Sequence, residues 1–395
     1  MMARFFTLRE ICMNFALTDE QRMYRAAVRA FVEKEIKPYA AEVDAKQELR
    51  WEAIAKMPSL GLTGLQVPEE YGGAGLDSVS AAIAIEELAR GCGSTALAVA
   101  AHNGLCCGPI VRWGSPEQKQ KYLPVLTSGK VLGSLALTEP GAGSDLSGGV
   151  RTSAVKEGDS WIIDGSKTWI TNATIAPVIV TLVRTDPKAD KPSRGQSLIL
   201  VERDTPGFSV EAPIAKLGVR GSHSCPLTYE EVRVPLGNLL GEEGRGLHQT
   251  AQTLDGGRVG IAACCVGLAQ AAFEAALKYI QEREAFGSKL AEHQAVQHKI
   301  AEMSARIDSA RLLTYYAAWQ KDQGGDFTQA AATAKLMASE TSEYAAFQAI
   351  QVHGGYGYSA EFPVERIYRD QRLMSIGEGA NEVLKNIIAR RVISG

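Results

Sequence analysis

The sequence lacks the signatures of several large protein classes. Its 395 residues carry 42 Lys plus Arg and 45 Asp plus Glu, a formal net charge of −3. This balance argues against nucleic acid as a partner, because a nucleic-acid binder would show a basic face. Neither a low-complexity segment nor a repeat with a period of about 20–50 residues is present. With 45% hydrophobic and 22% charged residues, the composition predicts a globular protein of two or three domains.

Cysteine is scarce and unpatterned. The seven Cys residues include two adjacent pairs in apolar stretches but no C-x-x-C spacing. We therefore expect reduced, buried thiols rather than disulfides or a zinc site. Membrane insertion is not expected either. Gly91–Val111 carries His, Asn and Pro, and the apolar run Val259–Phe273 is shorter than the roughly 20 residues that a bilayer needs.

Motifs of nucleotide and hydrolase chemistry are also missing. There is no Walker A sequence, no strict G-x-G-x-x-G and no G-x-S-x-G. Looser glycine patterns at Gly91–Ala96 and Gly355–Ala360 neither follow a predicted strand nor open a βαβ unit, so a Rossmann fold is not expected. His293 and His298 are five positions apart and do not share a helix face as the ligands of H-E-x-x-H do. A metal site is therefore set aside.

Hydrophobic periodicity changes twice along the chain. Helical spacing begins at the capping-box pair Thr18 and Gln21 and continues to about residue 126. Strand-like segments from about 131 to 240 predict antiparallel pairing, with a type I′ hairpin at Asp164–Gly165. Helical spacing then returns. Apolar residues recur every three to four positions from Val296 to Ala317, which predicts a long bundle helix.

The predicted fold class is mainly α with a β insert. We expect an N-terminal helical domain over 1–131, a central antiparallel β domain over 132–241 and a C-terminal four-helix bundle over 242–395. The first twelve residues are interpreted as disordered or as a misassigned start, because Met13 opens the first convincing helical region. An Arg-containing remnant of a transit peptide is the alternative for that segment.

Three glycine-rich polar stretches, Thr138–Asp145, Gln351–Gly357 and Ile376–Glu382, stand out from the helices and strands. The first is either a solvated turn or a loop whose bare N–H groups line a ligand. The second holds more glycine than a helix C-cap needs, which favours close approach of a phosphate or another backbone. The third places a Glu between two Gly. That Glu is either an exposed turn residue or a carboxylate base at the mouth of a cavity.

At these stretches the chain resembles the acyl-CoA dehydrogenase family. The matching segments follow the family's order over nearly the whole chain, from Phe15 to Val392. They are Leu135–Asp145 (LALTEPGAGSD), Trp169–Asn172 (WITN), Leu254–Arg258 (LDGGR), Arg283–Gly287 (REAFG), Gln294, Gln351–Gly357 (QVHGGYG), Tyr368–Arg372 (YRDQR) and Ile376–Glu382 (IGEGANE).

The resemblance implies FAD as the cofactor. Arg283 would pair with its pyrophosphate, as suits a guanidinium fork, and part of the site would come from a neighbouring subunit. A homo-oligomer, a dimer of dimers, is therefore expected. The implied cofactor-binding residues are Leu135, Ala136, Leu137, Thr138, Glu139, Pro140, Gly141, Ala142, Gly143, Ser144, Trp169, Ile170, Thr171, Arg283, Phe286, Gln294, Gln351, Val352, His353, Gly354, Gly355, Ala380, Asn381 and Glu382.

The resemblance also implies the reaction, oxidation of an acyl-CoA thioester to the trans-2-enoyl-CoA. Glu378 aligns with the base that removes the α-proton, because the other position used by some relatives is Gly257 here. For Asp255 and Arg258, a helix salt bridge is the alternative interpretation. The residues implied to contact the substrate are Ser144, Asp255, Gly256, Gly257, Arg258 and Gly379.

The expected electron acceptor is an electron-transfer flavoprotein. The expected location is the cytoplasm of a bacterium, or the mitochondrial matrix in a eukaryote. An oxidase or lyase of the same fold and a non-catalytic CoA- or flavin-binding scaffold are the alternatives. Two positions depart from many relatives: Gly377 replaces Tyr, and Ala380 replaces Thr or Ser. Loss of the tyrosine ring predicts a wider pocket and a branched, cyclic or otherwise broad acyl group.

Overall fold

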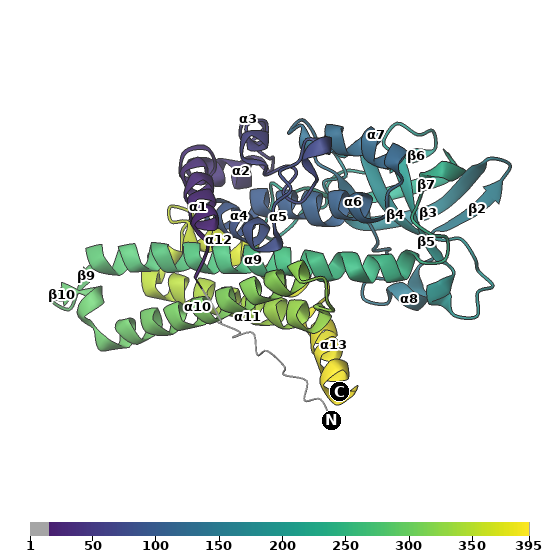
Figure 1. Cartoon of the computed structure of the whole chain (residues 1–395). Helices are drawn as coiled ribbons and strands as arrows, with labels where there is room; N and C mark the ends of the chain where they lie inside the picture. Colours follow the sequence, from purple (N-terminus) through teal and green to yellow (C-terminus); the bar gives the residue numbers. More distant parts are fainter. Residues whose placement is uncertain (1–15, 395) are drawn as a thin grey trace, which may run out of the picture.

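The computed structural model describes residues 16–394, so the interpretation of the first twelve residues lies outside the described part of the chain. Along the chain, helical segments precede and follow the sheet. In space the sheet lies at one end of the molecule, on the right in Figure 1, the N-terminal helices lie beside it, and the long helices run along one side. This arrangement confirms the predicted fold class. The six described cysteines are free and buried, as expected.

The N-terminal part is helical, and local signals set its boundaries. The capping box is confirmed: Thr18 Oγ1 accepts from the Gln21 N–H at 3.2 Å, and Gln21 Oε1 accepts from the Thr18 N–H at 3.1 Å. The α-helices here are α1 (Asp19–Phe31), α2 (Ala40–Lys46), α3 (Trp51–Ile54), α4 (Ser78–Gly91), α5 (Gly93–Ala101), α6 (Gly108–Trp113) and α7 (Pro116–Thr127).

The predicted helical spacing is interrupted between α5 and α6, where the structure has a π-helical stretch, His102–Cys107. The Asn103 amide lies in this stretch and donates to the carbonyls of Leu62 and Val99 at 2.9 and 3.0 Å. Its oxygen accepts from the Leu65 N–H at 2.9 Å. A side chain that competes for backbone groups in this way accompanies the irregular turn.

The central sheet has eight strands in the order β6-β7-β3-β2-β4-β5-β8, with β1 also paired to β4. The strands are β1 (Ser134–Ala136), β2 (Ser153–Glu157), β3 (Ser160–Thr171), β4 (Val178–Arg184), β5 (Gln196–Glu202), β6 (Phe208–Val210), β7 (Ser224–Pro235) and β8 (Leu239–Leu240). Most pairs are antiparallel as predicted. The sheet is nevertheless mixed, because β1 and β2 each run parallel to β4.

The predicted hairpin at Asp164–Gly165 is wrong. Strand β3 runs straight through these residues, and its pairing with β7 shifts register between Ile163 and Gly165. The turn instead lies between β2 and β3, where Glu157 pairs with Ser160 across two residues. Asp164 therefore lies opposite a β-bulge, because β7 has two residues, Glu230 and Glu231, where β3 has one.

The C-terminal part contains the long helices α9 (Gly246–Glu282), α10 (Gln294–Asp322) and α11 (Thr328–His353), followed by α12 (Val364–Gln371) and α13 (Asn381–Ser394). A short hairpin of β9 (Glu284–Ala285) and β10 (Ser288–Lys289) joins α9 to α10. The predicted seam of α10 is confirmed. Met303, Ile307, Ala310 and Ala317 are buried, and Val296, Ile300 and Leu313 pack against the same core.

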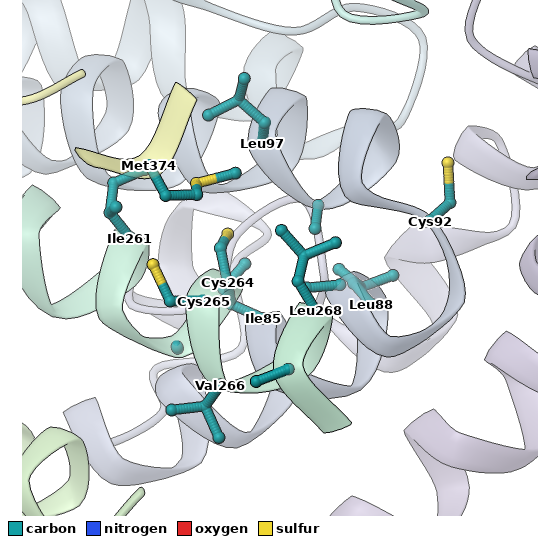
Figure 2. Close-up of a cluster of buried hydrophobic side chains, with 14 of the residues drawn as sticks. Ile85, Leu88, Cys92, Leu97, Ile261, Cys264, Cys265, Val266, Leu268 and Met374 are labelled. Atoms are coloured by element: carbon teal, nitrogen blue, oxygen red, sulfur yellow. The ribbon is translucent and has the colours of Figure 1, made fainter. Parts of the chain in front are cut away.

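The largest hydrophobic core joins the first and last parts of the chain. Figure 2 shows Ile85 and Leu88 of α4 meeting Cys264 and Leu268 of α9. Close approach of the two helices requires Gly267, because a Cβ there would lie 2.2 Å from the carbonyl oxygen of Glu86. The N-terminal helices therefore pack directly on the helix that carries several predicted site residues.

Two described helical segments, Gly93–Trp113 and Gly246–Glu282, are long and apolar enough to cross a membrane on length and composition alone. The second is longer than the apolar run suggested. However, 72% and 67% of their most apolar windows are buried inside the protein. Such burial is typical of core helices in a globular protein.

Candidate active site

Glu378 lies in a tight turn between the 3-10 turn Arg372–Ser375 and helix α13. Its backbone is left-handed, with φ +52°, and Gly379 follows at φ +99°. A left-handed non-glycine residue is uncommon and often marks a functional site. The turn directs the Glu378 side chain toward α9: a Cβ added to Gly257 would lie 2.1 Å from Glu378 Oε2.

Glu378 is half-buried, and its carboxyl is poorly satisfied. Oε2 is buried and has no hydrogen-bond partner within the described structure. Burial raises the pKa of Glu378 to about 7, although the positive charges of Lys335 and Arg258 oppose the rise. A carboxyl with a pKa near neutrality can exchange a proton at physiological pH, which is what a general base requires.

Asp255 and Arg258 form the helix salt bridge that the alternative interpretation proposed. Arg258 Nη1 lies 2.6 Å from Asp255 Oδ1, and both residues are buried in α9. The pair also connects the predicted site. Asp255 Oδ2 accepts from Thr328 Oγ1 at 2.7 Å, and Arg258 Nε donates to the Glu378 carbonyl at 3.4 Å. Asp255 and Arg258 can therefore form this salt bridge and also contribute to the site beside Glu378.

Sequence analysis missed Lys335, which lies under the same turn. Its ammonium donates to the Gly379 carbonyl at 2.8 Å and to Asn381 Oδ1 at 3.3 Å. The residue is 0% exposed, in α11. The available signal was a lone Lys among small apolar residues, since Ala331, Ala334 and Ala338 on the same helix are also buried.

The stretch Leu135–Ser144 runs from β1 into an open loop. Leu135 and Thr138 are partly buried, and Ala136, Leu137 and Ala142 are buried. Pro140, Gly141, Gly143 and Ser144 are exposed, and a Cβ at Gly141 or Gly143 would meet no atom within 4 Å. Bare backbone is therefore accessible along this loop.

Glu139 faces inward from this loop. Its carboxylate accepts from the Arg151 and Thr152 N–H groups at 2.7 and 2.9 Å and from Lys167 Nζ at 2.8 Å. Burial opposes ionisation, yet Lys167 and the two backbone donors hold the pKa of Glu139 below its ordinary value. Burial lowers the pKa of Lys167 to about 8. The Glu139 side chain therefore anchors the loop, and only its backbone is left for a cofactor.

We expect Lys167→Met to destabilise the protein by about 3–5 kcal/mol, because it leaves the Glu139 carboxylate buried without its cation. Urea unfolding followed by circular dichroism measures this loss. The matched control is Lys156→Met, which removes an exposed ion pair with Glu243 (2.6 Å) and should cost at most about 1 kcal/mol. Equal losses in the two variants would contradict the anchoring role of the buried pair.

Trp169, Ile170 and Thr171 end strand β3 beside this loop. Trp169 is 55% exposed with φ +61°, whereas Ile170 is buried in the sheet core. A large exposed aromatic side chain in a left-handed conformation offers a flat surface to a ring-shaped ligand. The side chain of Ile170 points away, so a contact from this residue would come from its backbone.

The other predicted cofactor residues lie at the far end of the long helices. A cavity of about 560 Å³ there is lined by Arg283, Val352, His353, Gly354 and Gly355, together with Tyr279, Leu290 and Tyr356. The Arg283 guanidinium lies over the Tyr356 ring at 5.7 Å, and His353 stacks on Tyr279 at 4.2 Å. Phe286 is 97% exposed, and Gln294 and Gln351 are also exposed.

Two groups of predicted cofactor residues are far apart within one chain: residues 135–144 with Trp169–Thr171, and the residues around Arg283. The sheet that carries the loop contacts the start of α9, where a Cβ at Gly246 would lie 2.5 Å from the Cα of Ser197 in β5, whereas Arg283 follows the last residue of the helix. From Asp255 to Arg283 alone, 28 helical residues at 1.5 Å each span about 40 Å. The long straight helix is visible in Figure 1. A single cofactor cannot bridge this span, so the two groups would serve one ligand only if they came from different chains.

The described residues fit a dinucleotide with an aromatic ring. Open glycines occur in both groups, since a Cβ at Gly354 or Gly355 would also meet nothing within 4 Å. Exposed aromatic side chains occur in both, at Trp169 and at Phe286. The exposed guanidinium of Arg283 suits a phosphate.

Comparison with known families decides the classification. The N-terminal, middle and C-terminal domains of acyl-CoA dehydrogenases match residues 18–130, 134–232 and 244–393.

The chain belongs to the acyl-CoA dehydrogenase family.

The resemblance seen in the sequence motifs is thereby confirmed, and the protein is an oxidoreductase. It is 48% identical to "Probable acyl-CoA dehydrogenase YngJ" of Bacillus subtilis over 96% of this chain and 100% of that protein. It is 43% identical to the mitochondrial short-chain specific acyl-CoA dehydrogenase of Rattus norvegicus over 98% of this chain and 93% of that protein.

Solved structures share the fold over nearly the whole chain. The butyryl-CoA dehydrogenase of Megasphaera elsdenii superimposes with a TM-score of 0.93 at 39% identity, covering 96% of this chain and all of that one. A chain from the structure of the electron transferring flavoprotein of Acidaminococcus fermentans gives a TM-score of 0.94 at 39% identity, over 97% of this chain and 100% of that one.

Proposed function

We propose that this acyl-CoA dehydrogenase binds FAD and oxidises a short acyl-CoA thioester to the trans-2-enoyl-CoA, with Glu378 as the base. One observation carries the proposal. Glu378 Oε2 is buried beside Gly257 without a partner, in a carboxyl whose pKa is raised to about 7. A structural carboxylate would have acquired a cation or N–H donors, as Glu139 has.

FAD, when bound, supplies the acceptor for the hydride that leaves the β-carbon. Residues 135–144 and Trp169–Thr171 would hold its ring. Arg283, Phe286, Gln294 and the 351–355 turn would hold the rest of a neighbouring subunit's FAD, with Ala380, Asn381 and Glu382 near the active turn. The separation of about 40 Å along α9 supports an assembly of at least two chains, and we propose the homotetramer that the family resemblance implies.

Glu378 would remove the α-proton of the thioester. A free carboxylate is too weak a base for this proton, so two effects must close the gap. Desolvation raises the basicity of Glu378. Hydrogen bonds to the thioester oxygen, including one from the Glu378 N–H, would stabilise the developing enolate charge. Ser144, Gly379 and the residues 255–258 would position the CoA thioester beside the base.

A short acyl group is supported by packing next to this site. One turn beyond Arg258 on α9, Ile261 is 3% exposed, and Leu97 and Met374 are 6% and 1% exposed in the same core. Figure 2 shows these three side chains gathered together. Relatives named as short-chain specific or butyryl-CoA enzymes agree with this chain length. Gly377 makes the proposed acyl pocket wider rather than longer, because a Cβ at this position would meet no atom nearer than 3.7 Å.

We expect flavin reduction to depend on pH through Glu378. Its pKa is raised to about 7, and only the ionised form accepts a proton, so the rate should rise about tenfold per pH unit below that value and level off above it. Anaerobic stopped-flow bleaching of the flavin from about pH 5 to about pH 9 measures this profile. A flat profile across this range would contradict a base of raised pKa.

The proposed activity is tested by anaerobic bleaching of bound flavin with a panel of acyl-CoA thioesters. Short thioesters should bleach it, and α- or β-branched ones should do so at least as well as straight ones. A preference confined to straight chains would refute the broad pocket. Binding of acyl-CoA without bleaching would indicate the scaffold instead, and rapid reoxidation of the positive case in air would indicate an oxidase.

We propose an electron-transfer flavoprotein as the acceptor. The shared fold with a chain from the Acidaminococcus flavoprotein structure supports a partner of this kind. A bacterial cytoplasm, or the matrix of a mitochondrion, is the proposed location, in keeping with relatives from both settings. Reduction of purified flavoprotein by the enzyme and butyryl-CoA, followed spectroscopically, tests this acceptor.

A further inference from the structure

We propose that Lys335 is a positioning residue for the base, holding the Glu378 turn through its hydrogen bonds and keeping the Glu378 carboxylate ionised through its charge. This inference rests on the proposed role of Glu378. The resemblance assigned no role to Lys335, and it aligns with none of the motifs quoted from the sequence.

The first part of the argument is geometric. Lys335 is fully buried in α11 and donates to the Gly379 carbonyl at 2.8 Å and to Asn381 Oδ1 at 3.3 Å. These acceptors follow Glu378 by one and three positions. On the other side, Arg258 Nε reaches the Glu378 carbonyl at 3.4 Å. The two cations therefore hold consecutive carbonyls of a turn whose left-handed backbone needs external support.

The second part concerns charge. Arg258 is neutralised by Asp255 at 2.6 Å, whereas Lys335 forms no ion pair with any carboxylate in residues 16–394. A buried ammonium that meets only neutral acceptors is costly, so its retention calls for an explanation. Glu378 is the nearby acid that lacks a partner of its own. The Lys335 charge lowers the pKa of Glu378 against the larger effect of burial.

Among the charged groups around Glu378, Lys335 is the main one whose charge a substitution can remove. Its own pKa is lowered to about 8 by burial, so it is still largely protonated at pH 7. The titratable and charged groups that act on Lys335 or Glu378 are Arg258, Cys264 and Cys265 of α9, and Glu382 of α13. Burial raises the pKa of both thiols well beyond neutrality, so they stay uncharged.

The test separates charge from hydrogen bonding. Lys335→Met removes both, Lys335→Gln keeps a donor but removes the charge, and Ser339→Ala keeps the charge but removes another hydrogen bond to Asn381 Oδ1, at 3.1 Å. Met and Gln approximate the length of Lys without a charge in this buried position. Lys216→Met is the control for loss of a half-buried lysine that donates to a backbone carbonyl elsewhere, that of Ser222.

The main readout is the pH midpoint of flavin reduction in the FAD-loaded enzyme. Loss of the nearby positive charge should raise the midpoint by about one to two pH units in both Lys335 variants. The Ser339 and Lys216 variants should keep the parent midpoint. An unchanged midpoint in Lys335→Gln, or an equal shift in Lys216→Met, would overturn the proposal. A variant that merely loosened the fold would lower the rate at every pH without moving the midpoint.

A second readout does not need turnover. Infrared difference titration follows the protonated carboxyl stretch of Glu378, with Glu378→Gln as the reference that lacks it. The titration should move upward in Lys335→Gln as the kinetic midpoint does. If Glu378→Gln keeps the parent's pH profile of flavin reduction, the proposed function fails. If that profile is lost in Glu378→Gln but unmoved in Lys335→Gln, only the role of Lys335 fails.

Discussion

Glu378→Gln is expected to lower the rate of flavin reduction by acyl-CoA about 10²–10⁴-fold or more, because an amide cannot accept the α-proton. Fold and acyl-CoA binding should be retained, since Gln preserves the shape and Oε2 makes no hydrogen bond in the described structure. Anaerobic stopped-flow measures the rate, and equilibrium titration with acyl-CoA measures binding. Glu117→Gln, on the surface of α7, is the matched control and should leave the rate unchanged.

The same variant should be more stable than the parent at alkaline pH. The folded-state pKa of Glu378 is raised to about 7 from an ordinary 4.5. Its ionisation therefore opposes folding increasingly as the pH rises through this window, and the cost is complete above the folded-state value. Thermal unfolding at pH values on either side of the window should show a gain for Glu378→Gln only on the alkaline side. Unchanged flavin reduction in this variant would reject Glu378 as the base.

Gly257→Ala is the second change expected to have a large effect. A Cβ at this position would lie 2.1 Å from Glu378 Oε2 and 3.0 Å from Leu105 Cδ2. The carboxylate is the end of a flexible side chain, so it should rotate away while the helix stays intact. We expect the loss of a correctly placed base to lower flavin reduction by about 10²-fold or more.

Gly260→Ala is the matched control, in the same helix and one turn further on. Its Cβ would make only an ordinary contact, 3.9 Å from Ala100 Cβ. Both substitutions replace a helix-interior glycine and should each gain about 0.5–1 kcal/mol of helix stability. Melting temperatures should thus be similar while the rates differ. If both variants reduce flavin at the parent rate, the carboxylate does not occupy the space beside Gly257 during the reaction.

Local sequence signals predicted the parts of the fold that depend on local physics. The Thr18–Gln21 capping box and the seam of α10 were both confirmed, because capping and helical periodicity are properties of a few neighbouring residues. The Asp164–Gly165 hairpin failed for the opposite reason. This dipeptide suits a tight turn, but pairing with β7 carries the strand through it, and only the tertiary structure reveals that partner.

The sequence predicted some residues of the candidate site and missed others, again because some contacts exist only in the tertiary structure. Family motifs singled out Glu378, Asp255 and Arg258, and the structure brings these residues together. Nothing local connects Lys335 with a turn more than forty positions later in the chain. Nor could spacing reveal that Glu139, inside a motif for cofactor binding, directs its carboxylate to Lys167 instead.

The length of α9 determines which subunit's active site is affected by an inactivating substitution. The helix carries Arg258 in its first half and leads into Arg283 at its C-terminal end, and in the proposed assembly these two positions serve different active sites. An inactivating substitution at Glu378 would abolish the activity of the chain that carries it. One near Arg283 would instead impair the active site of the neighbouring chain. Genetic dominance, and the complementation of one defective allele by another, would then follow from the geometry of a single helix.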